Sequence, residues 1–121
     1  MQKCRYYVKI AQTKRKLQND KERGMKKCES LEEVRTEIDN IDDQILELIA
    51  KRKDMVKQAA NFKHSVDEIK ADDRIDHVMD RVRHKALTLG VSPNLVSEIY
   101  RKMIDEMVET EIAQFRNVTN F

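Results

Sequence analysis

The sequence predicts an all-α fold, and three observations support this class. Charged residues make up 38% of the chain and apolar residues 40%, a balance typical of long amphipathic helices. Glycine occurs twice and proline once, so the residues that strands and hairpins need at their turns are scarce. At 121 residues the chain suits one domain and is short for two. We therefore expect one all-α domain.

The sequence features of membrane and metal-binding proteins are missing. No apolar run approaches the roughly 18 residues that a bilayer requires, and the N-terminus lacks the apolar core of a signal peptide. Cys4 and Cys28 lie outside the periodic segments without metal-ligand spacing, so we interpret both as free thiols. We expect a cytoplasmic protein with no membrane partner.

The N-terminal part of the chain differs in charge from the rest. Residues 1–27 hold ten Lys or Arg against two Asp or Glu, so we divide the chain into a basic extension, 1–27, and a helical domain, 28–121. A basic arm could bind nucleic acid, although most charge runs are solvated tails, and we do not expect a nucleic-acid partner. The stretch "KERGM" suggests an alternative, in which residues 1–24 are an extension upstream of Met25.

The first predicted helix starts at Leu31 and runs for about 32 residues, or about 48 Å. Its apolar residues recur every three or four positions, in register with a heptad repeat. They are Leu31, Val34, Ile38, Ile41, Ile45, Leu48, Met55, Ala59 and Phe62. Such a helix is longer than a small globule, so much of its apolar stripe must find a partner elsewhere.

We expect a break at residues 63–73, followed by a second helix that ends near Leu89. Ser65 with Glu68, or else the two aspartates that precede Arg74, can cap a following helix, and Gly90 suits its end. The predicted inward face consists of Ile75, Val78, Met79, Val82 and Ala86. The opposite face carries Asp73, His77, Asp80 and His84. We expect this polar column to form i,i+4 pairs in solvent and not to bind metal.

The third predicted helix starts with Ser92 as N-cap and Pro93 in the first helical position, where its missing N–H costs nothing. Its apolar residues cover a broad sector of the helix. They are Val96, Ile99, Tyr100, Met103, Ile104, Met107, Val108, Ile112 and Phe115. Glu111 projects near the middle of this sector, so a charge faces inward.

Several cations also occupy inward positions. On one helical wheel Arg52 and Lys63 lie about 20° apart in the apolar stripe, Arg35 lies at its edge, and Arg74 opens the second helix. A single such cation could set helix register or extend to water. Several cations are different, because an unpaired buried charge costs several kcal/mol and Glu111 cannot neutralise all of them. A ligand with two carboxylates, held by Arg side chains, would neutralise them.

The same residues limit the chemistry of such a pocket. The sequence shows no Ser or Cys nucleophile beside a base, no glycine-rich phosphate loop and no zinc-like cluster. Positioning and electrostatics remain, which suit a flexible dianion that must be held in one reactive conformer while charge develops on an ether oxygen. We expect no cofactor.

Three segments resemble a known family. "LEEVRTEIDNIDDQILELIAKRKDMVKQAANFK" resembles the first helix of the all-helical chorismate mutases, whose active site is lined by an early Arg, a mid-helix Arg and a later Lys. Arg35, Arg52 and Lys63 match these positions. In "DDRID", Arg74 matches another Arg that binds the substrate in this family. In "SEIYRKMIDEMVETEIAQF", Glu111 takes the place usually held by Gln. The resemblance covers roughly residues 30–116 and implies a fold and an activity.

The implied fold is an intertwined homodimer of three-helix protomers with a long first helix, in which each active site takes Arg35 from the neighbouring subunit. The resemblance implies that Arg35 and Arg52 hold the two carboxylates of chorismate. Lys63 and Glu111 would then face the ether oxygen whose charge grows as its bond breaks, and the product would be prephenate.

Two positions depart from the family pattern. Ile75 stands where typical mutases place a Glu that contacts the ring hydroxyl, and this looks more like the isochorismate pyruvate lyases of the same fold, which make salicylate and pyruvate. Glu111 would repel a developing oxyanion unless protonated, so we predict turnover that falls as pH rises. Chorismate mutase is the first prediction and the lyase the second. A helical dimerisation or nucleic-acid-binding module is a third, less favoured alternative.

Overall fold

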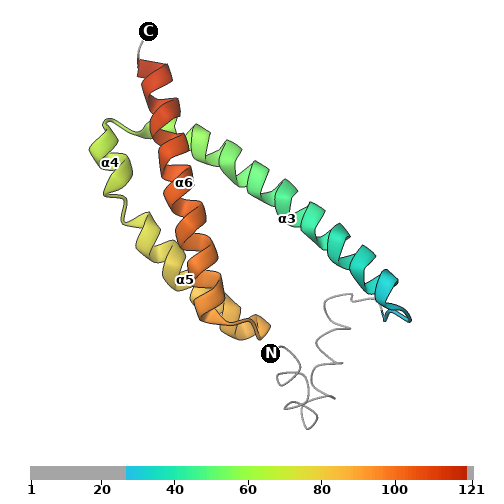
Figure 1. Ribbon diagram of the computed structural model, residues 1–121. Coiled ribbons are helices and arrows are strands. Elements are labelled where there is room, and N and C mark those ends of the chain that lie inside the picture. Colours follow the sequence, from blue (N-terminus) through green and yellow to red (C-terminus); the bar gives the residue numbers. More distant parts are fainter. Residues whose placement is uncertain (1–26, 120–121) are drawn as a thin grey trace. The chain divides into compact units, whose positions relative to one another are not determined.

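The computed structural model describes residues 27–119, and these are helical with short connections (Figure 1). The basic extension predicted for residues 1–27 therefore lies almost entirely outside the described residues. The helices are α3 (Leu31–Ala59), the 3-10 helix η2 (Ala60–Phe62), α4 (Val66–Lys70), α5 (Arg74–Leu89) and α6 (Pro93–Thr119). The chain divides into two units between Asp42 and Asp43, within α3.

Polar caps fix the start of α3 in the first unit. The Ser30 hydroxyl accepts a hydrogen bond from the Glu33 backbone N–H at 3.1 Å, and the Glu33 carboxylate accepts one from the Glu29 N–H at 3.0 Å. These reciprocal bonds satisfy N–H groups that have no partner inside the helix. The acidic side chains of Glu32 and Glu33 also favour the positive end of the helix dipole.

The apolar stripe of α3 is exposed to solvent within this chain. None of the 29 residues of α3 is buried, and all its large apolar side chains except the half-buried Val56 are 37% to 63% exposed. These side chains are Leu31, Val34, Ile38, Ile41, Ile45, Leu46, Leu48, Ile49 and Met55. A regular exposed apolar stripe of this length is typical of a surface that another protein chain covers.

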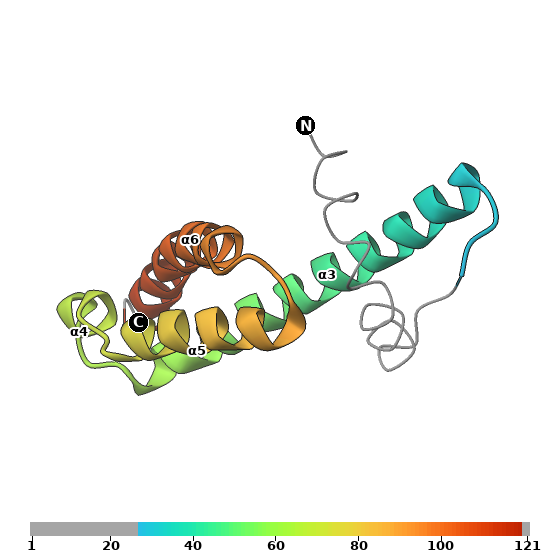
Figure 2. The same ribbon diagram turned by 90° about the horizontal axis from the view of Figure 1, so that it is seen from below.

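The core of the second unit lies where α5 packs along α6 (Figures 1 and 2). Val78 and Val82 of α5 form a buried cluster with Ile104 of α6. Partly buried apolar residues surround this cluster, namely Ile75, Met79, Val96, Tyr100 and Val108. The inward faces predicted for both helices are therefore confirmed, apart from Ile99, which is 53% exposed.

The turn between α5 and α6 uses the residues that the sequence indicated. Gly90 adopts a left-handed conformation with φ of 73°, and the Val91 N–H bonds the Ala86 carbonyl at 2.9 Å, which closes the end of α5. Ser92 Oγ accepts from the Leu95 N–H at 3.3 Å, and Pro93 is the first residue of α6.

The prediction for the end of the first helix was partly wrong. Lys63 does not lie on the helical wheel, because the chain tightens into η2 after Ala59 and Lys63 is extended, with φ of −96° and ψ of 152°. Ser65 caps α4 by accepting from the Glu68 N–H at 3.1 Å, and a capping residue needs non-helical backbone. The helix must therefore end before Ser65, and the predicted break contains a short helix of its own.

Two further expectations concern the surface. The polar column on α5 is exposed, as predicted, although His84 Nδ1 lies 2.8 Å from the backbone oxygen of Asp80 and not from its carboxylate. No helix within residues 27–119 is long and apolar enough to cross a membrane. The cytoplasmic location stays a prediction.

Candidate active site

A pocket of about 350 Å³ in the second unit gathers most of the charged residues that the sequence singled out. We call it the cationic pocket, and its charged lining residues are Arg52, Lys63, Asp72, Arg74 and Glu111. Arg52 comes from α3, Arg74 from α5 and Glu111 from α6. Lys63 precedes α4 in the chain, and Asp72 follows it. Three cations thus face two carboxylates.

Apolar side chains form the remaining wall of the cationic pocket. Ile75 lines it and also packs against the buried cluster of α5 and α6, so its position is fixed by the core. Ile69 of α4, which is 1% exposed, lines the pocket from the other side of the α4–α5 connection. The pocket therefore combines fixed charges with an apolar surface, as ligand sites commonly do.

Lys63 is the most strongly paired of the three cations. Its Nζ lies 2.9 Å from Asp72 Oδ2 and 3.4 Å from Glu111 Oε2. Burial alone would lower the pKa of Lys63, but the hydrogen bond to Asp72 and the negative charges of Glu111 and Asp72 outweigh burial, so this pKa lies above its ordinary value. Lys63 is therefore held as an ammonium inside the pocket.

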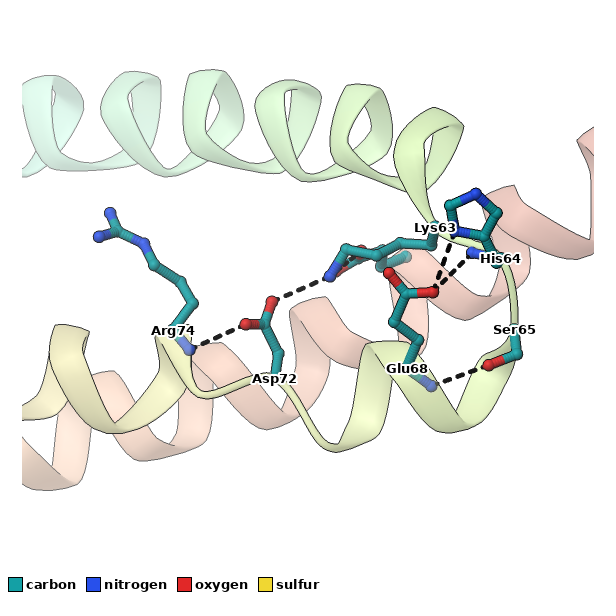
Figure 3. A network of polar contacts seen from close by, with 7 residues as sticks. Lys63, His64, Ser65, Glu68, Asp72 and Arg74 are labelled. Carbon is teal, nitrogen blue, oxygen red and sulfur yellow. Dashed lines mark hydrogen bonds and ion pairs between the residues drawn. The ribbon is translucent and has the colours of Figure 1, made fainter.

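Asp72 is fixed from two sides (Figure 3). Its Oδ2 accepts from Lys63 and its Oδ1 accepts from the Arg74 backbone N–H at 2.8 Å. Burial would raise the pKa of Asp72, but these two hydrogen bonds and the charges of Lys63 and Arg74 outweigh burial and lower it. From the sequence, Asp72 was predicted only as a possible helix cap. Its nearness to Lys63 depends on how the chain turns around α4.

Glu111 is the one buried charged residue among the described residues, at 8% exposed. Its Oε2 is within ion-pair distance of Lys63 but has no hydrogen-bond partner among residues 27–119, because the 3.4 Å contact lacks hydrogen-bond geometry. This oxygen has the Lys63 ammonium as its charged partner and can still accept a hydrogen bond from a ligand.

Arg52 is half-buried and has only uncharged contacts. Its Nη1 donates to the Met107 sulfur at 2.7 Å, and its guanidinium carbon lies 5.9 Å from the centre of the Tyr100 ring. Within residues 27–119, neither Arg52 nor Arg74 forms an ion pair through its side chain with a carboxylate. Both guanidinium groups can therefore donate hydrogen bonds to an anionic ligand.

The predicted site residue Arg35 belongs to the first unit, where it is exposed and lines a surface hollow together with Glu32, Glu33 and Asp39. Within the second unit, the structure brings the other predicted site residues together around the cationic pocket. They are Arg52, Lys63, Arg74, Ile75 and Glu111.

The fold and the pocket together define an all-α protein with a small cation-lined pocket. Comparison with known proteins gives the family: residues 34–112 match chorismate mutase type II. The chain is 33% identical over 78 residues to the chorismate mutase of Methanocaldococcus jannaschii, a match that covers 64% of this chain and 79% of that protein. The chain belongs to the chorismate mutase type II family.

A second relative is longer than this chain. The T-protein of Haemophilus influenzae is 31% identical over 84 residues, and the match covers 69% of this chain but only 22% of that protein. The chain thus spans about a fifth of the length of the T-protein. The family resemblance that the sequence motifs suggested is confirmed.

Proposed function

We propose that this chain is a chorismate mutase, which rearranges chorismate into its isomer prephenate. The observation that carries the proposal is the convergence of Arg52, Lys63 and Arg74 on one pocket inside the region that matches the family. A dianionic substrate complements such a pocket, because two of these cations have no ion-pair partner among the described residues. The reaction is an isomerisation, so neither a co-reactant nor a cofactor is needed.

Each pocket residue receives a role from its surroundings. Arg52 binds a substrate carboxylate through its planar fork of N–H groups, and Arg74 adds positive charge at the start of α5. Lys63 and Glu111 face the ether oxygen, where the Lys63 ammonium stabilises the charge that grows as the C–O bond breaks. Ile75 contacts the substrate ring through its apolar side chain.

We further propose that the chain acts as a homodimer in which Arg35 completes the pocket of the other subunit. The exposed apolar stripe of α3 supports this proposal, because a heptad-spaced stripe is stable when a second helix covers it. The second copy would then supply a fourth cation for the dicarboxylate.

The proposal is tested by offering chorismate and isochorismate separately to the purified protein. We expect chorismate to be consumed and prephenate to accumulate, with little salicylate from isochorismate. Salicylate release much faster than prephenate formation would instead identify a lyase, the alternative that Ile75 suggested. The family match and the chorismate mutase of Methanocaldococcus jannaschii support the mutase, so the mutase is the function we propose.

A further inference from the structure

We propose that Asp72 is a positioning residue that holds the Lys63 ammonium in the orientation in which it meets the substrate. This inference rests on the proposed function, because it assigns Lys63 to the substrate's ether oxygen. Asp72 itself would not touch the reacting atoms. It would act through Lys63.

The geometry of the contact carries the proposal. Lys63 follows η2 on an extended segment, and Asp72 lies between α4 and α5, so the 2.9 Å contact closes the loop around α4 (Figure 3). The Lys63 side chain is 15% exposed and that of Asp72 is 32% exposed, so the contact is partly shielded from water. A shielded ion pair in good geometry is stronger than one on the surface.

Asp72 is well suited to this task because its own carboxylate is anchored. Oδ1 accepts from the Arg74 backbone N–H at 2.8 Å, which ties the carboxylate to the first turn of α5 and leaves Oδ2 for Lys63. A lysine stem has four rotatable bonds and loses much conformational freedom when it is fixed. An anchored acceptor therefore reduces the freedom that Lys63 must lose when the substrate binds.

The hydrogen-bonding capacity of Lys63 leaves room for a substrate. An ammonium carries three N–H donors, and one is used by Asp72. Glu111 approaches from α6 without hydrogen-bond geometry, so donors remain available in the pocket. The charged groups around Lys63 are carboxylates of Asp72, Glu111 and Glu68, which favour the ammonium, and guanidinium groups of Arg52 and Arg74, which oppose it.

The substitution Asp72→Asn separates charge from structure. An Asn side chain still offers an oxygen to the Arg74 N–H but has no negative charge for Lys63. We expect kcat for chorismate to fall on the order of 10-fold with a smaller change in KM, since misplacement of a reacting group affects the transition state most. Asp72→Ala should lower kcat further, because it also removes the contact with Arg74.

The matched control is Asp73→Asn, which removes the same charge one residue away. Asp73 is exposed and makes no side-chain cap to α5, so kcat should stay unchanged in this variant. A second readout is the fall of kcat at high pH, where Lys63 loses its proton. It is recorded in variants that also carry Glu111→Gln, so that Glu111 does not contribute to the pH dependence. Asp72→Asn should move this fall to lower pH, which a purely structural role would not do.

A measurement on Lys63 alone separates this inference from the proposed function. The rate at which a small acylating reagent modifies Lys63 is followed against pH by peptide mass spectrometry, with no substrate present. Asp72→Asn should make Lys63 react at lower pH than in the wild type, and Asp73→Asn should not. Unchanged acylation together with unchanged kcat in Asp72→Asn would overturn the inference. Absence of chorismate turnover in the wild type would overturn the proposed function, while the acylation profile would still show whether Asp72 controls Lys63.

Discussion

Arg52 occupies the pocket with two uncharged contacts, the Met107 sulfur and the Tyr100 ring. A thioether is a weak acceptor and a cation–π contact at this distance is modest, so neither neutralises the guanidinium. A substrate carboxylate would replace the sulfur by a charged, bidentate acceptor. In contrast, Lys63 already has Asp72 and Glu111 beside it. Arg52 is therefore suited to binding a substrate carboxylate, and Lys63 to facing the ether oxygen.

The charge of Glu111 should limit how well the pocket stabilises the ether oxygen. A carboxylate repels the negative charge that grows on this oxygen, whereas the amide of Gln can donate a hydrogen bond to it, so we expect Glu111→Gln to raise kcat for chorismate. The measurement is kcat at saturating substrate, with Glu109→Gln on the exposed side of α6 as the control. A kcat in Glu111→Gln that is no higher than in the wild type would contradict this role.

The ion pair between Lys63 and Asp72 should also contribute to stability in a defined pH window. The lowered pKa of Asp72 means that its contribution is present above the ordinary value of 3.8 and is lost as pH falls through the lower folded value. The raised pKa of Lys63 means that its contribution is present below the ordinary value of 10.5 and is lost as pH rises through the higher folded value.

Asp72→Asn should therefore lower the free energy of unfolding by about 1 kcal/mol at neutral pH. The difference from the wild type should shrink as pH falls below 3.8. Urea unfolding at one fixed protein concentration measures the free energy of unfolding of the wild type and of Asp72→Asn, at neutral pH and at acidic pH. A difference that stays constant from neutral to strongly acidic pH would show that the charge of Asp72 is not the cause.

At the scale of single elements, the turn between α5 and α6 offers a clean test of the backbone argument. Gly90 has a φ of 73°, which side chains other than glycine adopt at a cost, and a Cβ at this position would meet no atom within 4 Å. Gly90→Ala should therefore lower the free energy of unfolding by about 1 kcal/mol through backbone strain alone, and Gly90→Asn should cost less. Thermal unfolding at one fixed protein concentration measures the expected order of stability, which is wild type, then Gly90→Asn, then Gly90→Ala. A Gly90→Ala variant as stable as the wild type would contradict the argument from backbone strain.

The elements that the sequence predicted well are those fixed by local chemistry. The helix ends at this turn are marked by Gly90 and Ser92, through bonds to neighbouring residues, and by Pro93 as the first residue of α6. Each of the three lies where it was expected. The path of the chain after Ala59 depends on competition between a continuing helix and the cap at Ser65, which periodicity alone does not resolve. The wheel therefore placed Lys63 on the helix, whereas it lines the pocket from an extended segment.

The contact between Lys63 and Asp72 could not be predicted in the same way. The two residues are nine positions apart, and no helical or strand periodicity brings them together. Their contact arises because the chain reverses around α4. Glu111, by contrast, was predicted to face inward from the apolar sector of α6, and it is buried. Helix periodicity thus located the residues of one helix face, whereas contacts across a loop required the structure.

At the scale of the whole molecule, the exposed stripe of α3 makes association with a second copy the central expectation. If each active site combines Arg35 of one subunit with Arg52 and Lys63 of the other, Arg35→Ala and Arg52→Ala should each be inactive alone. Dissociating and reassembling an equal mixture of the two should restore about a quarter of wild-type activity, because half of the dimers regain one intact site.

A matched mixture controls for this complementation. Arg52→Ala and Lys63→Ala affect the same half of the site, so their mixture should stay inactive in every dimer. Activity measurements are paired with sedimentation to show that subunits exchange. Full activity of Arg35→Ala by itself would contradict the shared site and leave the pocket within one chain.

Proton NMR of chorismate incubated with the purified chain and with Arg52→Ala tests the proposed activity without intermediate steps. We expect the wild type to convert chorismate to prephenate as the single product. We also expect Arg52→Ala to lower kcat/KM at least about 100-fold, because a charge-assisted contact to the substrate is lost. Absence of prephenate with the folded wild type, or conversion that survives the loss of both Arg52 and Lys63, would contradict the proposed activity.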